Sequence, residues 1–242
     1  MKIWAHRGCS QNYPENTLTS FEKAIQIKGL TGIELDIQLT KDGHMVVIHD
    51  EKVDRTTDGR GEVRNYTLPE LKKLKISAGE GRFEQIPTID EVFDLLEKSL
   101  KSGLKLNIEL KNSIFPYAGM EKQIIDLVYK RGLQDSIVYS SFSALSIERI
   151  RQIDSGAETG ILDSKVSDCL YKLKGGCGAD ALHPFWRGID LPKEKLKGYT
   201  VRAWLTGHLY PEKPTGTVLD LEALESIGIT DVFLNEPERY LG

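Results

Sequence analysis

Short strand-like runs alternate with helical patterns along most of this chain. The candidate strands are Lys2–His6, Gly32–Leu39, His44–His49, Leu104–Lys111, Ser136–Ser141, Glu158–Leu162, Ala179–His183, Tyr199–Leu205 and Thr230–Leu234. The candidate helices between them are Thr17–Lys28, Thr88–Leu100, Met120–Arg131, Ser143–Ile153 and Leu219–Ile227. Strands and helices that alternate at this pitch favour a sheet of parallel strands covered by helices.

The number of these units points to a particular α/β architecture. About eight strand–helix units in a chain of 242 residues correspond to the size of a (β/α)8 barrel, the TIM-barrel fold. We therefore predict a single TIM-barrel domain over residues 1–242. A doubly wound open sheet is the second interpretation, because the pattern alone does not separate the two folds.

One strand more than a barrel needs is explained by a hairpin. Lys41-Asp42-Gly43 is a turn signal between the second and third candidate strands, so these two strands are predicted to pair in antiparallel fashion. With the turn centred near Asp42, paired residues have numbers that sum to about 84. This register places His49 opposite Leu35, at the level of Glu34 and Asp36.

Residues 50–87 fit no strand–helix unit. They contain a Thr57-Asp58-Gly59 turn and a short helical segment, Thr67–Leu74, whose first residues form a capping box. We interpret residues 50–87 as a small insertion after the second-strand hairpin. It is expected on the C-terminal face of the barrel, where loops carry function.

Composition excludes several classes of protein. The formal net charge is −4, so no basic excess is present to neutralise a nucleic acid, and no nucleic-acid partner is expected. Apolar runs such as Met45–Ile48 are far shorter than the ~20 residues of a membrane span. The start of the chain leaves no room for a secretory signal, and the cysteines, Cys9, Cys169 and Cys177, show no paired metal spacing. A reduced, cytoplasmic protein without a membrane span is expected.

Charged residues lie inside two of the predicted strands, which is unusual because parallel strands are mostly apolar on both faces. Glu34 and Asp36 share one face of their strand, and Glu109 and Lys111 share one face of theirs, because strand side chains alternate. One interpretation is a satisfied layer of ion pairs inside the barrel. The other is a divalent cation held by Glu34, Asp36 and Glu109, for which oxygen ligands favour Mg²⁺ or Ca²⁺.

Two histidines and an arginine complete this group. His6 ends the first candidate strand and Arg7 follows it, while the hairpin register brings His49 to the same rim. A cation, Arg7 and Lys111 would neutralise a phosphodiester, and imidazoles suit proton transfer to and from its oxygens. Enolisation beside a metal-bound carbonyl would leave Arg7 and the second histidine without a task. Phosphodiester cleavage uses every member of the group.

At these residues the sequence resembles the glycerophosphodiester phosphodiesterase family, a TIM-barrel family of metal-dependent hydrolases. The resemblance is ordered from residue 6 to residue 142, and the insertion after His49 is also typical of the family. The matching segments are His6-Arg7-Gly8, Pro14-Glu15-Asn16-Thr17, Glu34-Leu35-Asp36, Thr40-Lys41-Asp42-Gly43, Val47-Ile48-His49-Asp50, Asp54-Arg55-Thr56-Thr57-Asp58-Gly59, Leu106-Asn107-Ile108-Glu109-Leu110-Lys111 and Ser140-Ser141-Phe142.

The resemblance implies a role for each matching residue. His6 and His49 would be the general acid/base pair. The three carboxylates would hold one divalent cation, Mg²⁺ or Ca²⁺, with Mn²⁺ as a third option. Arg7 and Lys111 would hold the phosphoryl oxygens, and Glu15 would support the cluster.

The resemblance also implies the substrate class. Glycerophosphodiesters such as glycerophosphocholine or glycerophosphoethanolamine would be cleaved to sn-glycerol 3-phosphate and an alcohol. Attack by the glycerol 2-hydroxyl through a cyclic phosphate and direct attack by water both stay open. The partner is thus a small molecule, and the protein would act as a monomer or a homodimer.

The C-terminal half departs from the family pattern. Trp204 is retained, and it either contacts the glycerol or alcohol moiety or fills the barrel mouth. Leu234-Asn235-Glu236-Pro237 stands where the family commonly closes with Thr-(Asp/Asn)-x-Pro. These departures leave the specificity for the leaving alcohol open.

Two other functions compete with the leading one. A phospholipase D-like enzyme that acts on lysophospholipid would need an apolar mouth, and acidic residues of the insertion argue against one: Asp50, Glu51, Asp54 and Asp58. A non-catalytic barrel that binds phosphodiesters or partner proteins is the third hypothesis. The intact set of histidines, carboxylates and cationic residues argues against it.

Overall fold

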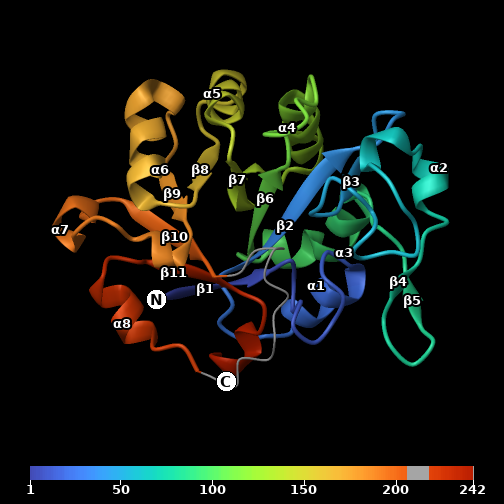
Figure 1. Cartoon of the computed structure of the whole chain (residues 1–242), viewed down its shortest axis with the longest axis horizontal. Helices are drawn as coiled ribbons and strands as arrows, with labels where there is room; N and C mark the ends of the chain where they lie inside the picture. Colours follow the sequence, from blue (N-terminus) through green and yellow to red (C-terminus); the bar gives the residue numbers. More distant parts are fainter. Residues whose placement is uncertain (206–217, 242) are drawn as a thin grey trace.

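The structure, a computed structural model, describes residues 1–205 and 218–241. Parallel strands in this part of the chain form a closed barrel (Figure 1): β1 (Lys2–His6), β2 (Gly32–Leu39), β6 (Lys105–Leu110), β7 (Ile137–Ser141), β8 (Glu158–Asp163), β9 (Ala181–Pro184), β10 (Thr200–Trp204) and β11 (Asp231–Leu234). Because β1 pairs with both β2 and β11, the sheet closes on itself. The predicted (β/α)8 barrel is confirmed, and the open sheet is excluded.

Helices cover the outside of the barrel. They are α1 (Leu18–Ala24), α3 (Ile89–Lys101), α4 (Met120–Arg131), α5 (Ala144–Ile153), α6 (Val166–Lys172), α7 (Lys193–Leu196) and α8 (Leu221–Ser226). Short helical turns are η1 (Val63–Asn65), η2 (Gln134–Ser136), η3 (Leu173–Cys177), η4 (Trp186–Gly188) and η5 (Pro237–Arg239). None of the helices within the described residues has the length and apolar character that crossing a bilayer takes.

The predicted helices are all present, most of them with shifted ends. The helix α4 begins and ends as predicted, whereas α1 stops at Ala24 rather than Lys28. At the start of α3 the Thr88 side chain accepts the N–H of Glu91, and the Glu91 carboxylate accepts the N–H of Thr88. This reciprocal capping box is the one that the sequence predicts, and it satisfies two helix donors.

The hairpin after β2 has the predicted register. The third strand, β3 (Met45–Val47), is antiparallel to β2 and pairs Ile37 with Val47 and Leu39 with Met45. It is shorter than the predicted strand, because the chain leaves the ladder after Val47. One further bond, from the Ile48 N–H to the Asp36 carbonyl at 3.1 Å, directs the next residue, His49, toward the barrel rim.

Residues 50–87 form a lobe beside β3, in cyan to green at the right of Figure 1. The lobe contains η1, α2 (Leu68–Leu71) and a small antiparallel hairpin of β4 (Ile76–Ser77) and β5 (Phe83–Glu84) that the sequence did not predict. Its side chains form a hydrophobic cluster together with two residues of the β3 region: Val46, Ile48, Val53, Val63, Leu71, Ile76 and Ile86. The lobe is therefore anchored directly to the strand that precedes it.

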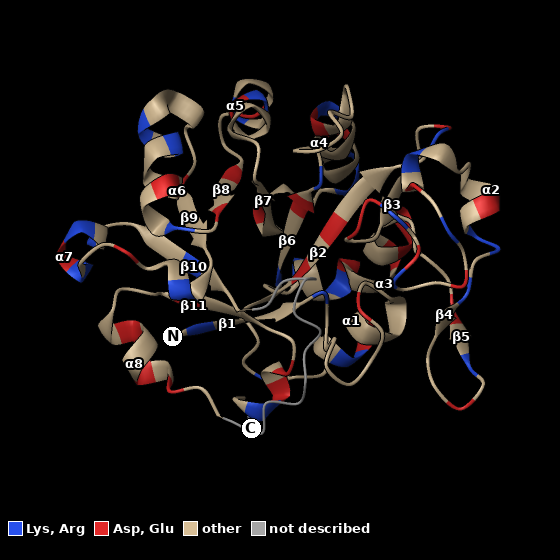
Figure 2. Ribbon diagram, in the orientation of Figure 1, with Lys and Arg blue, Asp and Glu red and all other residues tan. Residues whose placement is uncertain are grey.

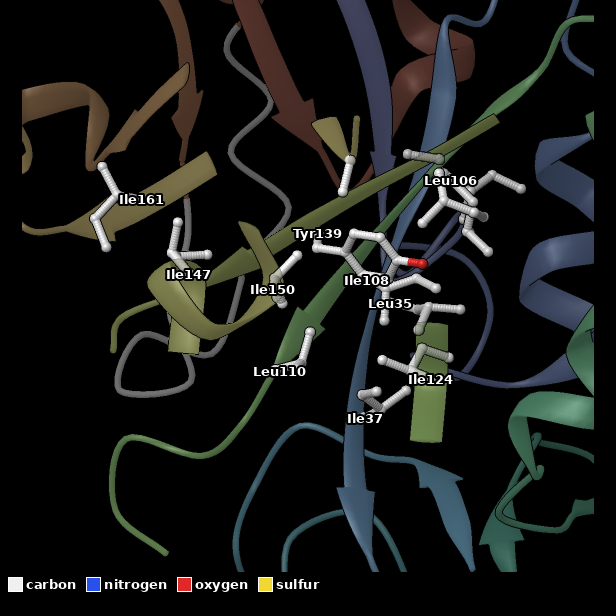
Figure 3. Close-up of a cluster of buried hydrophobic side chains, with 14 of the residues drawn as sticks. Leu35, Ile37, Leu106, Ile108, Leu110, Ile124, Tyr139, Ile147, Ile150 and Ile161 are labelled. Atoms are coloured by element: carbon white, nitrogen blue, oxygen red, sulfur yellow. The ribbon is translucent and has the colours of Figure 1, made fainter. Parts of the chain in front are cut away.

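The main hydrophobic core lies between the barrel and its helices. Outward-facing residues of the strands, such as Leu35, Ile108 and Tyr139, meet Ile124 of α4 and Ile150 of α5 in this layer (Figure 3). Along each strand, side chains point alternately outward to the helices and inward to the barrel axis. Burying the apolar set outside consequently turns the polar set toward the barrel axis.

An ion-pair layer closes the N-terminal end of the barrel. Arg202 on β10 lies 2.5 Å from Glu158 and 3.4 Å from Asp231, and its guanidinium stands over the Trp4 ring. The Trp4 indole N–H donates to Asp231 at 2.9 Å. Both carboxylates are thus paired at this end, so the C-terminal end is the one left for chemistry.

Candidate active site

Three carboxylates meet at the C-terminal end of the barrel. Glu34 and Asp36 lie on β2, and the strand register sets Asp36 directly beside Glu109 on β6. The acidic positions within these strands are visible in Figure 2. Ligand oxygens of the three residues lie within 4.8 Å of one another, and all three residues are buried. The structure therefore brings together the metal ligands that the sequence predicts.

Burial and mutual repulsion disfavour the ionised form of two of the three carboxylates. Burial, together with the charge of Asp36, raises the pKa of Glu34 well above its usual value. Burial also raises the pKa of Glu109, against the opposing charge of Lys111. For Asp36, burial is outweighed by His49, Arg7 and Lys111, which lower its pKa.

One fully buried oxygen of the cluster has no hydrogen-bond partner among the described residues. Asp36 accepts a bond from the Asn16 amide at 2.9 Å on Oδ2, whereas its buried Oδ1 has no hydrogen-bond partner there. A buried carboxylate oxygen of this kind is costly unless something binds it. An all-oxygen set of three carboxylates fits a hard divalent cation such as Mg²⁺ or Ca²⁺.

The turn after β1 is built around a strained residue. Arg7 has φ = 55° and Asn16 has φ = 56°, in the left-handed region that residues other than glycine rarely adopt. The strain directs the Arg7 N–H to Glu34 at 3.0 Å and lets its carbonyl accept bonds from the Asn16 N–H and the Ser20 hydroxyl. A Cβ at Gly8 would lie 2.2 Å from the Ser20 hydroxyl oxygen, which explains the glycine.

The Arg7 side chain lies between two acidic residues. Its Nε is 3.4 Å from Asp36, and its Nη1 donates to Glu15 at 2.9 Å. Burial alone would lower the pKa of Arg7, but these carboxylates raise it. The guanidinium is therefore fully cationic. The pKa of Glu15 is lowered to about 2, because hydrogen bonds and charge from Arg55 and Arg7 outweigh burial.

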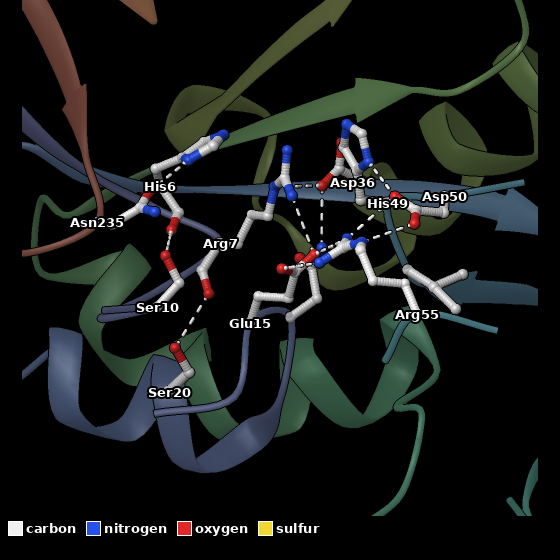
Figure 4. Close-up of polar contacts among 12 residues, drawn as sticks. His6, Arg7, Ser10, Glu15, Ser20, Asp36, His49, Asp50, Arg55 and Asn235 are labelled. Atoms are coloured by element: carbon white, nitrogen blue, oxygen red, sulfur yellow. Dashed lines mark hydrogen bonds and ion pairs between the residues drawn. The ribbon is translucent and has the colours of Figure 1, made fainter. Parts of the chain in front are cut away.

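His49 lies between the carboxylate of Asp50, which Figure 4 shows beside it, and the ammonium group of Lys111. Its Nδ1 is 2.7 Å from Asp50, and its Nε2 is 3.1 Å from Nζ of Lys111. The same ammonium group is 3.0 Å from Glu109. Burial lowers the pKa of His49 to about 4; Asp36 opposes this effect, and Arg7 and Lys111 add to it.

His6 approaches the cluster from the opposite side. Its Nδ1 is 2.6 Å from the amide oxygen of Asn235, and its Nε2 is 3.9 Å from Glu34. Burial, followed by the charge of Arg7, lowers the pKa of His6 to about 3. Both predicted histidines thus flank the acidic cluster and are uncharged at neutral pH.

Trp204 lies at the end of β10, within a group of aromatic side chains. Its ring is 4.7 Å from that of Phe185 and 6.4 Å from that of Phe142, and its indole N–H donates to the His183 carbonyl at 3.1 Å. The contacts that the structure shows for Trp204 are this hydrogen bond and aromatic packing. A contact with substrate remains a prediction.

Four residues that the sequence analysis gave no role contact the predicted set directly: Asn16, Asp50, Arg55 and Asn235. Each lies in a segment that matches the family pattern or stands where the pattern ends. Position within those segments was the available signal. A spacing argument could not find these residues, because each lies in a loop and not on a strand or a helix.

Comparison with known proteins places this geometry in context. The sequence profile described as "Glycerophosphoryl diester phosphodiesterase family" matches residues 6–172. A glycerophosphodiester phosphodiesterase of Caldanaerobacter subterraneus subsp. tengcongensis is 36% identical over 247 residues, which cover 99% of this chain and 96% of the relative. One of Bacillus subtilis is 31% identical over 255 residues, or 98% of this chain and 84% of the relative.

Solved structures show the same fold. A phosphodiesterase of Oleispira antarctica, in complex with the product sn-glycerol-3-phosphate, superposes with a TM-score of 0.80 at 27% identity, covering 99% of this chain and 94% of that one. A glycerophosphodiester phosphodiesterase of Thermotoga maritima gives a TM-score of 0.71 at 26% identity, with coverages of 98% and 96%. The similarity spans nearly the whole of each chain.

Proposed function

Because the chain belongs to the glycerophosphoryl diester phosphodiesterase family and is an enzyme that cleaves glycerophosphodiesters, we propose that it does so with one divalent cation and two histidines. The products are sn-glycerol 3-phosphate and an alcohol such as choline or ethanolamine. The observation that carries this proposal is the convergence of three buried carboxylates with His6 and His49. The glycerol phosphate product in the Oleispira antarctica relative supports the substrate class.

The cation site consists of Glu34, Asp36 and Glu109. The unpartnered Oδ1 of Asp36 and the mutual repulsion of the three carboxylates support this assignment. Mg²⁺ or Ca²⁺ fits the oxygen donors best, with Mn²⁺ as a third option. When bound, the cation neutralises charge on the phosphoryl group and so lowers the barrier to attack.

Two cationic side chains bind the phosphoryl oxygens. Arg7 and Lys111 are both held beside the carboxylates and are both cationic, because nearby acids raise their pKa against the effect of burial. A bound phosphodiester would accept hydrogen bonds from these groups in place of the present contact between Lys111 and His49. Release of Lys111 from His49 would expose Nε2 to the reacting oxygen.

The two imidazoles move the protons. Ionised carboxylates and amide oxygens only accept hydrogen bonds, so Asp50 and Asn235 keep the proton of each ring on Nδ1. Each Nε2 is then an acceptor that faces the cluster. One histidine takes the proton of the attacking hydroxyl or water; the other, once protonated beside the anionic substrate, donates to the leaving alkoxide.

We propose that residues 1–242 form one domain and that residues 50–87 are an insertion on the face of the barrel that carries the site. The hydrophobic cluster of the lobe and the contacts of Arg55 with Glu15 and Asp50 support this view. Trp204 is proposed to contact the glycerol or alcohol moiety. A monomer or a homodimer would work equally well, because one chain supplies every group.

The test is a screen of glycerophosphodiesters with Mg²⁺, Ca²⁺ and Mn²⁺ in turn, in which release of glycerol 3-phosphate is measured. We expect turnover that EDTA abolishes and that a divalent cation restores. His6→Ala and His49→Ala should each lower kcat by about 10²–10⁴-fold, the usual contribution of a general acid or base.

A matched control is His44→Ala, since the His44 side chain is 56% exposed in the hairpin turn. It should keep native turnover. Undiminished turnover in either His6→Ala or His49→Ala, or full activity in EDTA, would contradict the assigned chemistry. Lysophosphatidylcholine in the same screen tests the phospholipase D-like alternative.

A further inference from the structure

We propose that Arg55, from the lobe of residues 50–87, is a positioning residue that aligns both His49 and Arg7 through the carboxylates behind them. This inference rests on the proposed function, in which His49 moves a proton and Arg7 binds the phosphoryl group. Neither the family match nor the sequence motifs give Arg55 a task. Its task follows from the contacts of one guanidinium with two carboxylates.

The guanidinium of Arg55 binds both carboxylates in a two-point manner (Figure 4). Its Nε and Nη2 lie 2.7 Å and 3.0 Å from the two oxygens of Asp50. Its Nη1 and Nη2 lie 2.7 Å and 2.6 Å from the two oxygens of Glu15. Paired hydrogen bonds of this kind fix orientation as well as distance.

Each of these carboxylates also holds a residue of the proposed machinery. The Asp50 oxygen that accepts from Arg55 Nη2 is 2.7 Å from Nδ1 of His49. The Glu15 oxygen that accepts from Arg55 Nη2 also accepts from Arg7 at 2.9 Å. A single nitrogen, Nη2, therefore connects the proton-transfer group and the phosphoryl-binding group.

The backbone on both sides of Arg55 is held by hydrogen bonds and by packing. Val53 is fully buried in the hydrophobic cluster of the lobe. The N–H and hydroxyl of Thr57 both return to the Val53 carbonyl, and Asp54 accepts the N–H of Gly61. Because these bonds fix the backbone on both sides of Arg55, its side chain reaches the rim from a rigid turn.

The exposure of Arg55 favours positioning over global stability. Its side chain is 37% exposed, and partly exposed ion pairs contribute little to folding. A planar fork is nevertheless needed for the geometry, since a lysine offers one point charge and cannot bind two carboxylates in pairs. Arg55→Lys should therefore behave much like Arg55→Gln.

The test uses steady-state kinetics with glycerophosphocholine at saturating divalent cation. We expect Arg55→Gln to lower kcat/KM about 10–100-fold, the usual effect of removing a group that orients a reacting residue. The contacts of Arg55 with Asp50 and with Glu15 should have different kinetic effects. Asp50→Asn acts on His49 and should lower kcat, whereas Glu15→Gln acts on Arg7 and should raise KM; Arg55→Gln should do both.

The double variant Arg55→Gln/Asp50→Asn should lose no more in kcat than the worse single variant, because both act on one unit. Arg60→Gln is the matched control, as Arg60 is an exposed arginine of the same lobe. It should keep native kinetics. Thermal unfolding midpoints of all variants should stay close to the native value.

A second readout does not depend on turnover. In ligand-free protein with ¹⁵N-labelled histidine, NMR should show the Nδ1–H tautomer of His49, assigned by the loss of its signals in His49→Gln. Arg55→Gln and Asp50→Asn should shift these signals toward a mixture of tautomers. This measurement decides the proposal even if the native chain proves inactive on glycerophosphodiesters.

Three results would overturn the positioning role. The first is native kinetics in Arg55→Gln. The second is full activity in Arg55→Lys, which would show that charge suffices. The third is an unchanged His49 tautomer in both variants.

Discussion

At the scale of single residues, the hydrogen-bond partners of a buried histidine indicate its role better than its burial does. His6, His49 and His183 are all buried. The first two have a partner on Nδ1, whereas neither ring nitrogen of His183 has a hydrogen-bond partner within the described residues. His183 packs beside Phe233, with ring centroids 5.5 Å apart. His183 thus fills the core, whereas His6 and His49 are the two histidines that we propose to transfer protons.

His183 is expected to lower the stability of the fold in acid. Burial, followed by the charge of Arg202, lowers its pKa well below 6.5. Above about pH 6.5 the residue is neutral whether folded or unfolded; below it, the unfolded chain binds a proton that folded His183 does not. Stability is therefore lost as pH falls. His183→Leu should reduce this loss by up to about 1.4 kcal/mol per pH unit in urea unfolding between pH 7 and pH 5.

The control for this prediction is His44→Leu, because the His44 side chain is exposed. Its unfolding free energy should follow the native pH dependence. Identical slopes for His183→Leu and the native chain would mean that His183 takes up its proton without cost in the folded barrel.

At the scale of elements, local patterns were sufficient where local contacts decide. The turn at Lys41-Asp42-Gly43 set the register of β2 and β3, and the Thr88 capping box marked the start of α3. The helix α6 was not predicted, because its segment runs into η3, where Gly176 has a non-helical φ of 104°. The role that we propose for Arg55 could not be predicted either, since it depends on how the lobe folds back onto the rim.

The strands β8 and β9 give an element-scale prediction. Gly160 faces the His183 ring, and a Cβ there would lie 2.2 Å from Nε2. Gly160→Ala should lower the free energy of unfolding by about 1–3 kcal/mol through overpacking. His183→Ala in the same chain should recover part of the loss, because it removes the ring that clashes. Urea denaturation of the single and double variants measures both effects.

Gly156→Ala is the matched control, since the nearest atom to its added Cβ, a carboxylate oxygen of Asp154, would be 3.4 Å away. It should change stability by no more than about 0.5 kcal/mol. Equal losses for Gly156→Ala and Gly160→Ala would show that chain flexibility, rather than the packing of His183, governs the effect.

At the scale of the whole molecule, the two ends of the barrel treat buried charge in opposite ways. At the N-terminal end, Arg202 lies between Glu158 and Asp231. At the C-terminal end, Glu34 and Asp36 converge with a third carboxylate, and the repulsion between them is only partly offset. The first arrangement pairs its buried charges, and the second stores unfavourable energy where a cation is expected.

This contrast predicts that stability and metal binding change in opposite directions. Glu34→Gln keeps an oxygen for the Arg7 N–H but removes one repelling charge, so unfolding without metal should cost about 0.5–2 kcal/mol more than in the native chain. Native protein should gain about 2.7 kcal/mol from Mg²⁺ at a hundred times its Kd, and Glu34→Gln much less. Urea unfolding with and without Mg²⁺ measures both. A variant that is less stable without metal, yet gains as much from Mg²⁺, would show that Glu34 is a structural partner of Arg7 and not a ligand.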